Sequence, residues 1–458
     1  MSDHALDGGG GVARVARVGD GGGAPVRMVH LGLGAFHRAH QAWYTHRANL
    51  AASGAGGHPA DPSDAAGAAD AADLWGIAAF TGRRPDAARA LAAQGCAYTL
   101  LVREPDGDAA ERITSISGAY DGADTAAWRG AVANPRVAVV TLTITEPAYG
   151  ATSAMRRLAD GLAARRDAGA GPLAVVSCDN LPANGARTRD AVLGAADDPR
   201  LAQWITDHVS FVDTVVDRIT PAATDDDRAA SGDPCVVVTE PFTEWYLAGE
   251  FPAGRPAWEV EGARFVPDVE VYTRRKLWLL NAGHSLLAYL GLARGHTSID
   301  EAMADGECRR ALDALWDDAA PVLPLPEREI RDARAALVRR FTNPRIRHLL
   351  EQIAKDGSAK LPARSTPVVA ARLADGATPG DGQLRLWSAW LAHLRSGWTS
   401  DADPGGAPLA ARARTSLADG AAAVVDHLLP AARPETITSI VDDVARGAAQ
   451  IEGTRSTA

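Results

Sequence analysis

The apolar positions of roughly the first 270 residues fall into short continuous runs. The runs most typical of strands are Val26–Gly34, Leu74–Phe80, Tyr98–Glu104, Val137–Thr145 and Leu173–Asn180. Stretches of helical character lie between several of them. A strand that is apolar throughout is typical of a parallel sheet with helices on both faces. The pattern therefore predicts an α/β domain in this part of the chain.

From about Tyr272 onward the pattern changes to that of helices, with few strand candidates. The helical stretches are residues 274–293, 301–318, 333–341 and 346–354. We therefore predict an α/β domain over 25–270 and a mostly α-helical domain over 271–458. Residues 1–24 are glycine-rich and aperiodic and are predicted to be a disordered leader. Residues 54–73 are rich in turn formers and are predicted to be a surface insertion.

Composition narrows the class of partner. The 458 residues carry a formal charge of −10, which argues against nucleic acid because phosphate binding needs clustered lysine and arginine. The four cysteines show neither C-x-x-C pairs nor zinc-finger spacing. The N-terminus has no apolar signal run, and the apolar stretch Leu277–Ala293 is too short to span a bilayer comfortably. We expect a soluble, cytoplasmic protein with no nucleic-acid or membrane partner.

A glycine turn follows the first predicted strand. Gly32 and Gly34 occupy the first two glycine positions of a dinucleotide fingerprint, and Ala35 and Phe36 continue into a helix whose N-terminus can receive phosphate. The third glycine is absent, and Arg38 lies near its place, where it would add a charged contact. An ordinary strand-to-helix turn is the alternative.

The end of the second predicted strand bears on the choice of cofactor. An acid there would bind the ribose hydroxyls of NAD, but the sequence continues as Thr81, Gly82, Arg83 and Arg84. The two arginines would accommodate the 2′-phosphate of NADP, unless they are only solvated loop charges. Thr81 and Arg83 are candidate cofactor contacts, and both NAD and NADP stay open.

A set of polar residues interrupts the apolar helix that starts the second domain. At about 100° per residue, Asn281 lies about 140° and His284 about 80° from Lys276, so the three fit one face. A buried lysine loses proton affinity and becomes a general base near neutral pH. An asparagine amide donates to a developing alkoxide, and a histidine holds a neighbouring hydroxyl. The alternative is a buried helix with satisfied polar residues.

With these residues in view, the sequence resembles the polyol-specific long-chain dehydrogenases, the family of mannitol 2-dehydrogenase and fructuronate reductase (D-mannonate oxidoreductase). The matching stretches are residues 30–45, 142–149, 177–185, 216–222, 240–247, 254–259, 265–285 and 341–364. They follow the family's order through most of residues 26–365. The tail after about 365 is less diagnostic.

The resemblance implies a Rossmann-like dinucleotide-binding domain and roles for individual residues. Lys276 would be the general base, without a metal, and Asn281 with Asn180 would stabilise the oxyanion. His284 would orient the substrate. The other implied contacts are Asp217 and Lys360 to the sugar chain, and Thr143 and Glu146 to the cofactor. The alternatives are an ion pair for Asp217 and a solvated loop lysine for Lys360.

Two positions depart from the family pattern. Thr273 stands where a glutamate usually precedes the catalytic lysine, which puts that glutamate's role in proton passage in doubt here. Gln352 stands where mannitol dehydrogenases carry an arginine. The segment from Gln352 to Arg364 looks closer to fructuronate reductases. Arg364 would pair with a hexonate carboxylate, or else form a structural salt bridge.

The predicted activity is an NAD(P)-dependent oxidation of a secondary alcohol, interconverting a polyol or hexonate and its keto sugar. The sequence leaves D-mannonate/D-fructuronate and D-mannitol/D-fructose both open. A non-catalytic dinucleotide-binding regulator of the same fold is the alternative. A zinc alcohol dehydrogenase is a further rival, but the sequence lacks its Cys/His ligand pattern. The resemblance also implies a monomer.

Overall fold

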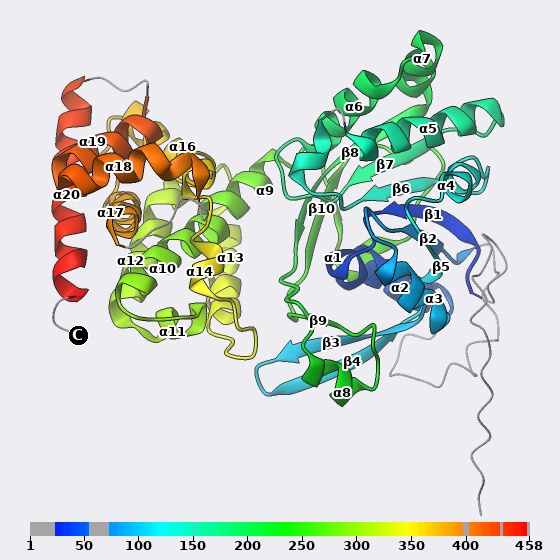
Figure 1. The fold of residues 1–458 in the computed structure, drawn as a ribbon, viewed down its shortest axis with the longest axis horizontal. Coiled ribbons are helices and arrows are strands. Elements are labelled where there is room, and N and C mark those ends of the chain that lie inside the picture. The colour runs from blue at the N-terminus through cyan, green and yellow to red at the C-terminus, as the bar shows by residue number, and fades with distance from the viewer. Residues whose placement is uncertain (1–22, 55–72, 151, 397–402, 431–433, 456–458) are drawn as a thin grey trace, which may run out of the picture. The chain divides into compact units, whose positions relative to one another are not determined.

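The computed structural model describes residues 23–54, 73–150, 152–396, 403–430 and 434–455 (Figure 1). The predicted leader 1–24 and the predicted insertion 54–73 lie outside the described residues except for their ends. The chain divides into two compact units, Met1–Val269 and Glu270–Ala458. We call them the α/β unit and the helical unit and describe each by itself.

The α/β unit contains an eight-stranded sheet in the order β11-β10-β8-β7-β6-β1-β2-β5 and a three-stranded sheet in the order β4-β3-β9. The strands of the large sheet are β1 (Val26–Leu31), β2 (Gly76–Phe80), β5 (Ile116–Tyr120), β6 (Val139–Leu142), β7 (Leu173–Ser177), β8 (Val209–Asp217), β10 (Glu244–Ala248) and β11 (Arg264–Phe265). The strands of the small sheet are β3 (Tyr98–Glu104), β4 (Gly107–Ile113) and β9 (Val237–Thr239).

Six neighbouring strands of the large sheet, in the sheet order β5-β2-β1-β6-β7-β8, are parallel. The chain reverses its direction of winding at β1. Strand β1 pairs on one side with β2 and on the other with β6. This is the doubly wound Rossmann order, in which ligands bind beyond the carboxyl ends of the strands at the point of reversal. The carboxyl end of β1 is therefore where the fold favours a dinucleotide.

Helices cover both faces of the large sheet (Figure 1). They are α1 (Ala35–Ala39), α2 (Gln41–Ala52), α3 (Asp86–Ala93), α4 (Thr125–Val132), α5 (Ser153–Asp167), α6 (Asn184–Ala195) and α7 (Pro199–His208), with short turns η2 (Glu146–Tyr149) and η3 (Trp258–Glu261). Helix α8 (Asp225–Ser231) lies beside the small sheet (Figure 1), where its Asp227 pairs with Arg103 of β3. Successive β1 residues alternate between two cores: Met28 packs with α1 to α3, and Val29 with α4 to α7. This two-sided burial explains the unbroken apolar runs of the sequence.

The run Tyr98–Glu104 was predicted to join the parallel sheet, and this prediction is wrong. It forms β3 of the small sheet, antiparallel to β4 along its whole length and parallel to β9. The physical reason is visible in its burial, since only Tyr98 and Leu100 are buried and the strand ends exposed at Glu104. The run therefore forms one strand of the β3–β4 hairpin and does not pair with the large sheet.

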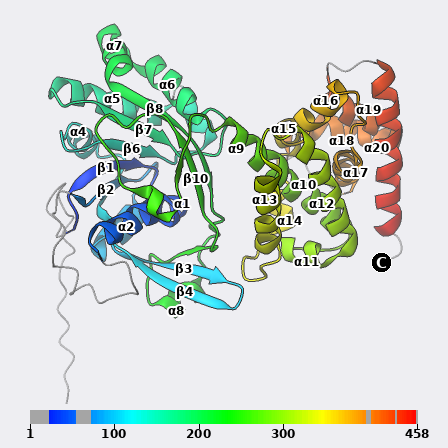
Figure 2. The same cartoon turned by 180° about the vertical axis from the view of Figure 1, so that it is seen from behind.

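The helical unit is built around α10, in which nearly every residue is buried (Figure 2). Its helices are α9 (Glu270–Arg275), α10 (Ala282–Ala293), α11 (Ile299–Ala304), α12 (Gly306–Ala319), α13 (Glu327–Phe341), α14 (Leu350–Ile353), α15 (Gly357–Arg364), α16 (Thr366–Ala374), α17 (Asp381–Arg395), α18 (Ala407–Thr415), α19 (Leu417–Leu428) and α20 (Pro434–Arg455). The π-helical turn η4 (Lys276–Asn281) joins α9 to α10, and η5 (Ala320–Val322) and η6 (Pro404–Gly406) are short 3₁₀ turns. None of the helices in the described ranges is long and apolar enough to cross a membrane.

Candidate functional site

Three predicted cofactor residues lie side by side because the strands before them are in register. Leu31, the last residue of β1, pairs with Phe80 of β2 and with Leu142 of β6. The next residues along the three strands are Gly32, Thr81 and Thr143. They therefore meet at one edge of the sheet, at the switch point.

The turn after β1 requires a glycine. Gly32 has φ +110°, and a Cβ on it would lie 2.0 Å from the carbonyl oxygen of Thr143. The Thr143 hydroxyl donates to the Gly32 carbonyl at 2.8 Å and also contacts Nε2 of His30 at 3.1 Å. Helix α1 starts directly after Gly34, so the N–H groups of Ala35 and Phe36 have no acceptor within the helix. A close-fitting turn with free amides is what a pyrophosphate needs.

Arg38 is engaged inside the α/β unit. Its guanidinium donates to the carbonyls of Cys235 at 2.6 Å and Gly34 at 3.3 Å. It also lies 5.4 Å from the ring of Tyr98, whose hydroxyl donates to the Arg38 carbonyl. Arg38 thus joins α1 to β3 and to the chain before β9, and its phosphate contact stays a prediction.

At the end of β2, Thr81 is buried, and its hydroxyl accepts from the backbone N–H of Gly122 at 2.9 Å. Arg83 and Arg84 are exposed. Asp86 lies in the first turn of α3 rather than at the strand end. The arginines are thus available to solvent, and their contact with a cofactor stays a prediction.

A carboxylate organises the loop after β6. Asp179 accepts from the backbone N–H groups of Ile144 at 3.0 Å and Thr145 at 2.9 Å, and from the hydroxyl of Tyr149 at 2.6 Å. Thr145 has φ +71°, a strained conformation that these bonds hold in place. Burial raises the pKa of Asp179, although its three donors oppose this. Glu146, a predicted cofactor contact, is exposed in the turn that follows.

Asn180 follows this carboxylate and is exposed beyond the end of β7. The neighbouring Asn184 ties β7 to β8, since its amide donates to the carbonyls of Asp179 and Thr214 and accepts from the N–H of Thr214. Asp217 is the last residue of β8, is buried, and pairs in register with Glu244 of β10. The hydrogen bonds of Asn184 therefore fix the loop that bears Asn180 to strand β8.

Lys276, Asn281 and His284 lie together at the start of the core helix of the helical unit, but not on the continuous α-helix predicted for them. Residues Lys276–Asn281 form a π-helical turn, and the backbone N–H of Ala282 donates to the carbonyl of Leu277, five residues back. A hydrogen bond that spans five residues brings residues five apart closer to alignment than an α-helix does. The π-turn therefore favours a shared face for Lys276 and Asn281 more than the predicted geometry did.

Side chains from other helices hold the π-turn in place. Trp316 of α12 donates its indole N–H to the carbonyl of Leu279 at 3.0 Å. Arg364 of α15 donates to the carbonyl of Asn281 at 3.2 Å and to the hydroxyl of Ser285 at 2.8 Å. A π-turn leaves carbonyls without their usual α-helical donors, and these two side chains supply the replacements.

Polar atoms of this region are buried without a partner. They are Oδ1 of Asn281, Nε2 of His284 and Nδ1 of His348. The rings of His284 and His348 meet edge to face with centroids 5.0 Å apart. A buried polar group that makes no hydrogen bond costs about 1–3 kcal/mol. Three of them close together indicate a site whose partners come from a ligand or from water.

Positive charge surrounds the same histidine. The pKa of His284 is held well below its ordinary value, first by burial and then by His348, Arg340, Arg364 and Lys276. Burial also lowers the pKa of Arg364 to about 10. No carboxylate within the described ranges forms an ion pair with Arg364, so the structural salt bridge considered for it is not seen there. The site is therefore suited to an anion.

Lys360 sits on a helix whose start is fixed by close packing. A Cβ on Gly357 would lie 2.5 Å from both Trp390 and Tyr289, which explains the glycine in the D-G-S-A-K stretch of residues 356–360. The ammonium of Lys360 donates to the carbonyl of Lys355 at 2.7 Å and lies 3.8 Å from Asp356. Burial and then Arg364 lower its pKa. Lys360 is thus a half-buried lysine near Arg364 and not a freely solvated one.

The two departures from the family pattern occupy different surroundings. Thr273 is half-buried in α9, one helical turn before Lys276. Gln352 is exposed in α14. Thr273 therefore lies one turn from Lys276, the predicted general base, whereas the side chain of Gln352 faces solvent.

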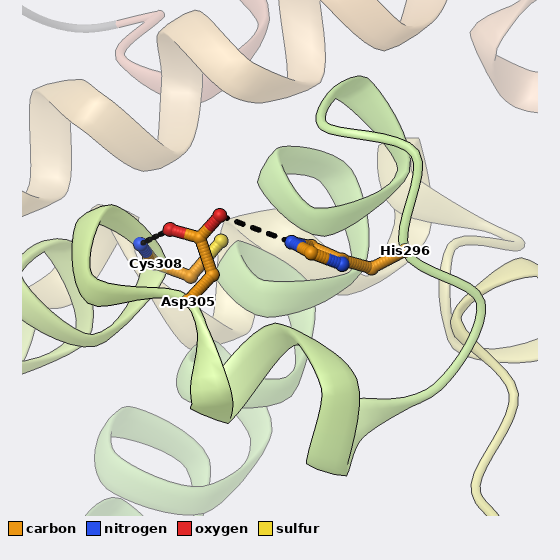
Figure 3. Close-up of side chains that lie close together, drawn as sticks. All are labelled: His296, Asp305 and Cys308. Carbon is orange, nitrogen blue, oxygen red and sulfur yellow. Dashed lines mark hydrogen bonds and ion pairs between the residues drawn. The ribbon is translucent and has the colours of Figure 1, made fainter. Parts of the chain in front are cut away.

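A separate trio could hold a metal by proximity alone. Over the described ranges the one such group is His296, Asp305 and Cys308, whose ligand atoms lie within 4.8 Å of one another (Figure 3). Asp305 already accepts from His296 at 3.0 Å and from Arg294 at 2.6 Å, and it caps α12 through the N–H groups of Glu307 and Cys308. Burial raises the pKa of the Cys308 thiol to about 12. These contacts are those of a helix cap with an ion pair, and a bound cation would have to displace the guanidinium.

Comparison with known proteins decides the family. The mannitol dehydrogenase Rossmann domain matches residues 26–260, and the mannitol dehydrogenase C-terminal domain matches residues 268–428. The chain belongs to the mannitol dehydrogenase family. It is thus an oxidoreductase of CH–OH groups, and the predicted Rossmann-like domain followed by a mostly helical domain is confirmed.

Named relatives span neutral and charged substrates. The chain is 38% identical to D-arabinitol 4-dehydrogenase of Ralstonia nicotianae over 78% of this chain and 80% of the relative. It is 36% identical to D-mannonate oxidoreductase of Escherichia coli over 76% of each. A solved ternary complex of Pseudomonas fluorescens mannitol 2-dehydrogenase with NAD and D-mannitol is 29% identical, with a TM-score of 0.74 over 97% of this chain and 95% of that one.

Sequence reasoning did not single out His348 or Asp179. His348 lies 64 residues after His284, so no periodicity within one helix connects them. Asp179 is flanked by Cys178 and Asn180 in the C-D-N stretch, and the resemblance pointed to the asparagine. The signal for Asp179 was its position two residues after the end of a buried strand, where a carboxylate needs several donors.

Proposed function

We propose that the protein is an NAD-dependent dehydrogenase that interconverts a hexonate and its keto-hexonate, of the D-mannonate/D-fructuronate kind. Membership in the mannitol dehydrogenase family supports the reaction class. The relative named D-mannonate oxidoreductase supports a charged substrate. The similarity to a mannitol 2-dehydrogenase solved with NAD supports the cofactor.

The residues after β1 fit a dinucleotide. Gly32 permits contact with Thr143 that any side chain would block, and α1 presents unpaired N–H groups at Ala35 and Phe36. When bound, NAD accepts a hydride from the substrate carbon. Gly34, Thr81, Thr143, Glu146 and Arg83 remain proposed contacts, with Arg38 as a further one. Because Arg83 and Arg84 are exposed and could contact a 2′-phosphate, NADPH is tested beside NADH in the assay below.

Lys276 is the proposed general base. In the oxidation direction its Nζ takes the proton of the substrate hydroxyl as the C–H bond breaks; in reduction the ammonium returns that proton to the carbonyl oxygen. The amides of Asn281 and Asn180 donate to the oxygen as it gains negative charge. His284 accepts from or donates to a neighbouring hydroxyl. None of these roles uses a metal.

Arg364 is the residue that most supports a hexonate over a neutral polyol as the substrate. It is a half-buried cation that uses only two of its N–H donations on the protein, to Asn281 and Ser285, and no described carboxylate pairs with it. Guanidinium binds carboxylate with a two-pronged geometry, and a buried cation is most stable when an anion is present. Lys360 adds a second positive charge nearby. Asp217 is retained as a proposed contact to the sugar chain.

A single assay plate tests this proposal. Purified protein is mixed with NADH or NADPH and with D-fructuronate, D-tagaturonate, D-fructose or the ketose of D-arabinitol, and loss of nicotinamide absorbance is followed. We expect the fastest NADH oxidation with a keto-hexonate. Turnover only with neutral ketoses would refute the charged substrate, and cofactor binding without turnover on any of them would favour a non-catalytic regulator.

The proposed enzyme acts as a monomer in the cytoplasm. Sedimentation at assay concentration would check the first point: a single species of 47.7 kDa is expected, and a stable dimer would contradict it.

A further inference from the structure

His348 presents a buried ring nitrogen beside the proposed catalytic residues. Its Nδ1 has no partner, and neither has Nε2 of His284, whose side chain is only 7% exposed. The two rings meet edge to face at 5.0 Å. Two unsatisfied imidazole nitrogens therefore lie in one small region, on residues from different parts of the helical unit.

The backbone around His348 is held rigidly. The carbonyl of His348 accepts from the N–H of Ile299 at 3.1 Å, and the N–H of Leu350 donates to the carbonyl of Thr297 at 3.0 Å. Ser298 and Leu349 form a β-bridge between the same segments. The ring is thus presented from a fixed position, as a binding residue needs to be.

The chemistry of the pair matches adjacent hydroxyl groups. Burial lowers the pKa of His348, and that of His284 is lowered further, so both rings are neutral near pH 7. A neutral imidazole offers one donor and one acceptor, and a hydroxyl is both. The ring of Phe341 also packs on His284, with centroids 4.6 Å apart. The two unsatisfied nitrogens of the pair would give a hydroxyl-bearing ligand the hydrogen bonds that the protein does not supply them.

We propose that His348 is a specificity-determining residue that hydrogen-bonds, through Nδ1, the substrate hydroxyl next to the one held by His284. This rests on the proposed function and refines it. The site would then select carbon chains with hydroxyls on neighbouring carbons and discriminate against deoxy analogues at one of those carbons. Arg364 selects the charged end, and His348 selects the hydroxyl pattern.

Substitutions that distinguish the role of the His348 ring nitrogen from that of the aromatic ring itself test the proposal. His348→Phe keeps an aromatic ring against His284 but removes the nitrogen. His348→Asn places an amide near the Nδ1 position, and His348→Gln places it near Nε2. His208→Phe is the matched control, because that exposed histidine stacks on Trp204 of the α/β unit.

We expect His348→Phe to raise KM for the keto-hexonate by up to about tenfold, with a smaller change in kcat, as loss of one hydrogen bond to the substrate predicts. His348→Asn should recover most of the loss and His348→Gln should not. With a deoxy analogue at the carbon that His348 contacts, wild type and His348→Phe should have the same KM. His208→Phe should match wild type throughout.

Equal KM for wild type and His348→Phe, or an equal loss in His348→Phe and His348→Asn, would overturn the proposal and leave His348 a packing residue. If the wild type turns over none of the substrates, the proposed function fails separately. Calorimetric affinity of the NADH-loaded variants for mannonate then tests His348 without turnover. The same loss in His348→Phe and recovery in His348→Asn are expected, and unchanged affinity would refute the role.

Discussion

The loop after β6 in the α/β unit and the π-turn in the helical unit both position proposed functional residues, but they do so in opposite ways. In the loop, Asp179 satisfies the backbone at Ile144 and Thr145 and binds Tyr149. In the π-turn, Trp316 and Arg364 supply donors to the backbone carbonyls of Leu279 and Asn281. In the π-turn region, by which we mean the turn with His284 and His348, side-chain atoms of Asn281 and of both histidines are left without partners.

This difference separates a pre-built loop at the proposed cofactor site from a proposed substrate site whose unpaired atoms a ligand would satisfy. A loop held by three hydrogen bonds to one carboxylate is expected to keep its shape whether or not a dinucleotide is bound. Buried polar atoms without partners lower the stability of the π-turn region when no ligand is bound. They also increase the affinity for a ligand that supplies the missing hydrogen bonds. The comparison therefore predicts that changes in the π-turn region act on turnover and specificity, and changes in the loop on stability.

The largest expected effect comes from Lys276→Ala. Removal of a general base should lower kcat by about 10²–10⁴-fold, because proton transfer must then go to water. Binding of NADH, followed by nicotinamide fluorescence, should be unchanged because the proposed cofactor contacts are in the α/β unit. Lys355→Ala, at an exposed lysine, is the control and should behave as wild type. A Lys276→Ala enzyme with a near-normal rate would remove Lys276 from the mechanism.

The next effect is expected at Arg364. Arg364→Lys keeps a positive charge but loses the two-pronged geometry, so kcat/KM for a keto-hexonate should fall about 10- to 100-fold. The corresponding ketose should lose much less, and the ratio of the two cancels any damage to the π-turn. Arg372→Lys is the control, because that arginine is occupied by Thr378 and Asp318. An equal loss for both substrates would make Arg364 purely structural.

A smaller effect, on stability, should follow Asp179→Asn. The amide keeps one acceptor for three donors and adds a donor of its own, so the free energy of unfolding should fall by about 2 kcal/mol. Urea unfolding measures this, and a raised KM for NADH should accompany it. Asp190→Asn, on the exposed face of α6, should change neither. A variant as stable as wild type would show that the loop is not held by its carboxylate.

The smallest effect near neutral pH is the pH dependence of the stability of the α/β unit. Burial lowers the pKa of His30 to about 3, and that of His37, stacked on it, well below its ordinary value. Below about pH 6.5 the unfolded chain binds protons that the folded chain cannot, so stability falls as pH falls, by about 1.4 kcal/mol per pH unit for each histidine. For His30 this loss continues down to about pH 3.

Replacing one member of this stack isolates its contribution. His37→Phe should reduce the slope of unfolding free energy against pH by about one proton between pH 6 and 5. Urea titrations at several pH values measure the slope, and His208→Gln, at an exposed position, should keep the wild-type slope. An unchanged slope in His37→Phe would mean that His37 is protonated in the folded protein.

The sequence predicts the α/β half of the fold well where burial is two-sided. The apolar runs at Val29 and Val140 lie in the parallel sheet, and the glycine turn at Gly32 follows the first strand as expected. The run at Tyr98 failed because an apolar run indicates burial but not the sheet it joins. Pairing with β4 and β9 is a tertiary property that local pattern does not carry.

The residues of the candidate site were likewise predictable only where they belong to one continuous segment. Spacing and family resemblance point to Lys276, Asn281 and His284, which belong to one continuous segment. The π-turn itself was not predictable, because its stability comes from Trp316 and Arg364, which are distant in sequence. His348 was missed for the same reason.

The most direct test of the central claim is the ratio of kcat/KM for D-fructuronate to that for D-fructose, with NADH and the wild-type protein. If a charged ligand completes the π-turn region through Arg364, the ratio should exceed about tenfold, the gain expected from one charge-assisted hydrogen bond. A ratio at or below one would contradict the account, because the half-buried Arg364 would then have no part in selecting the substrate.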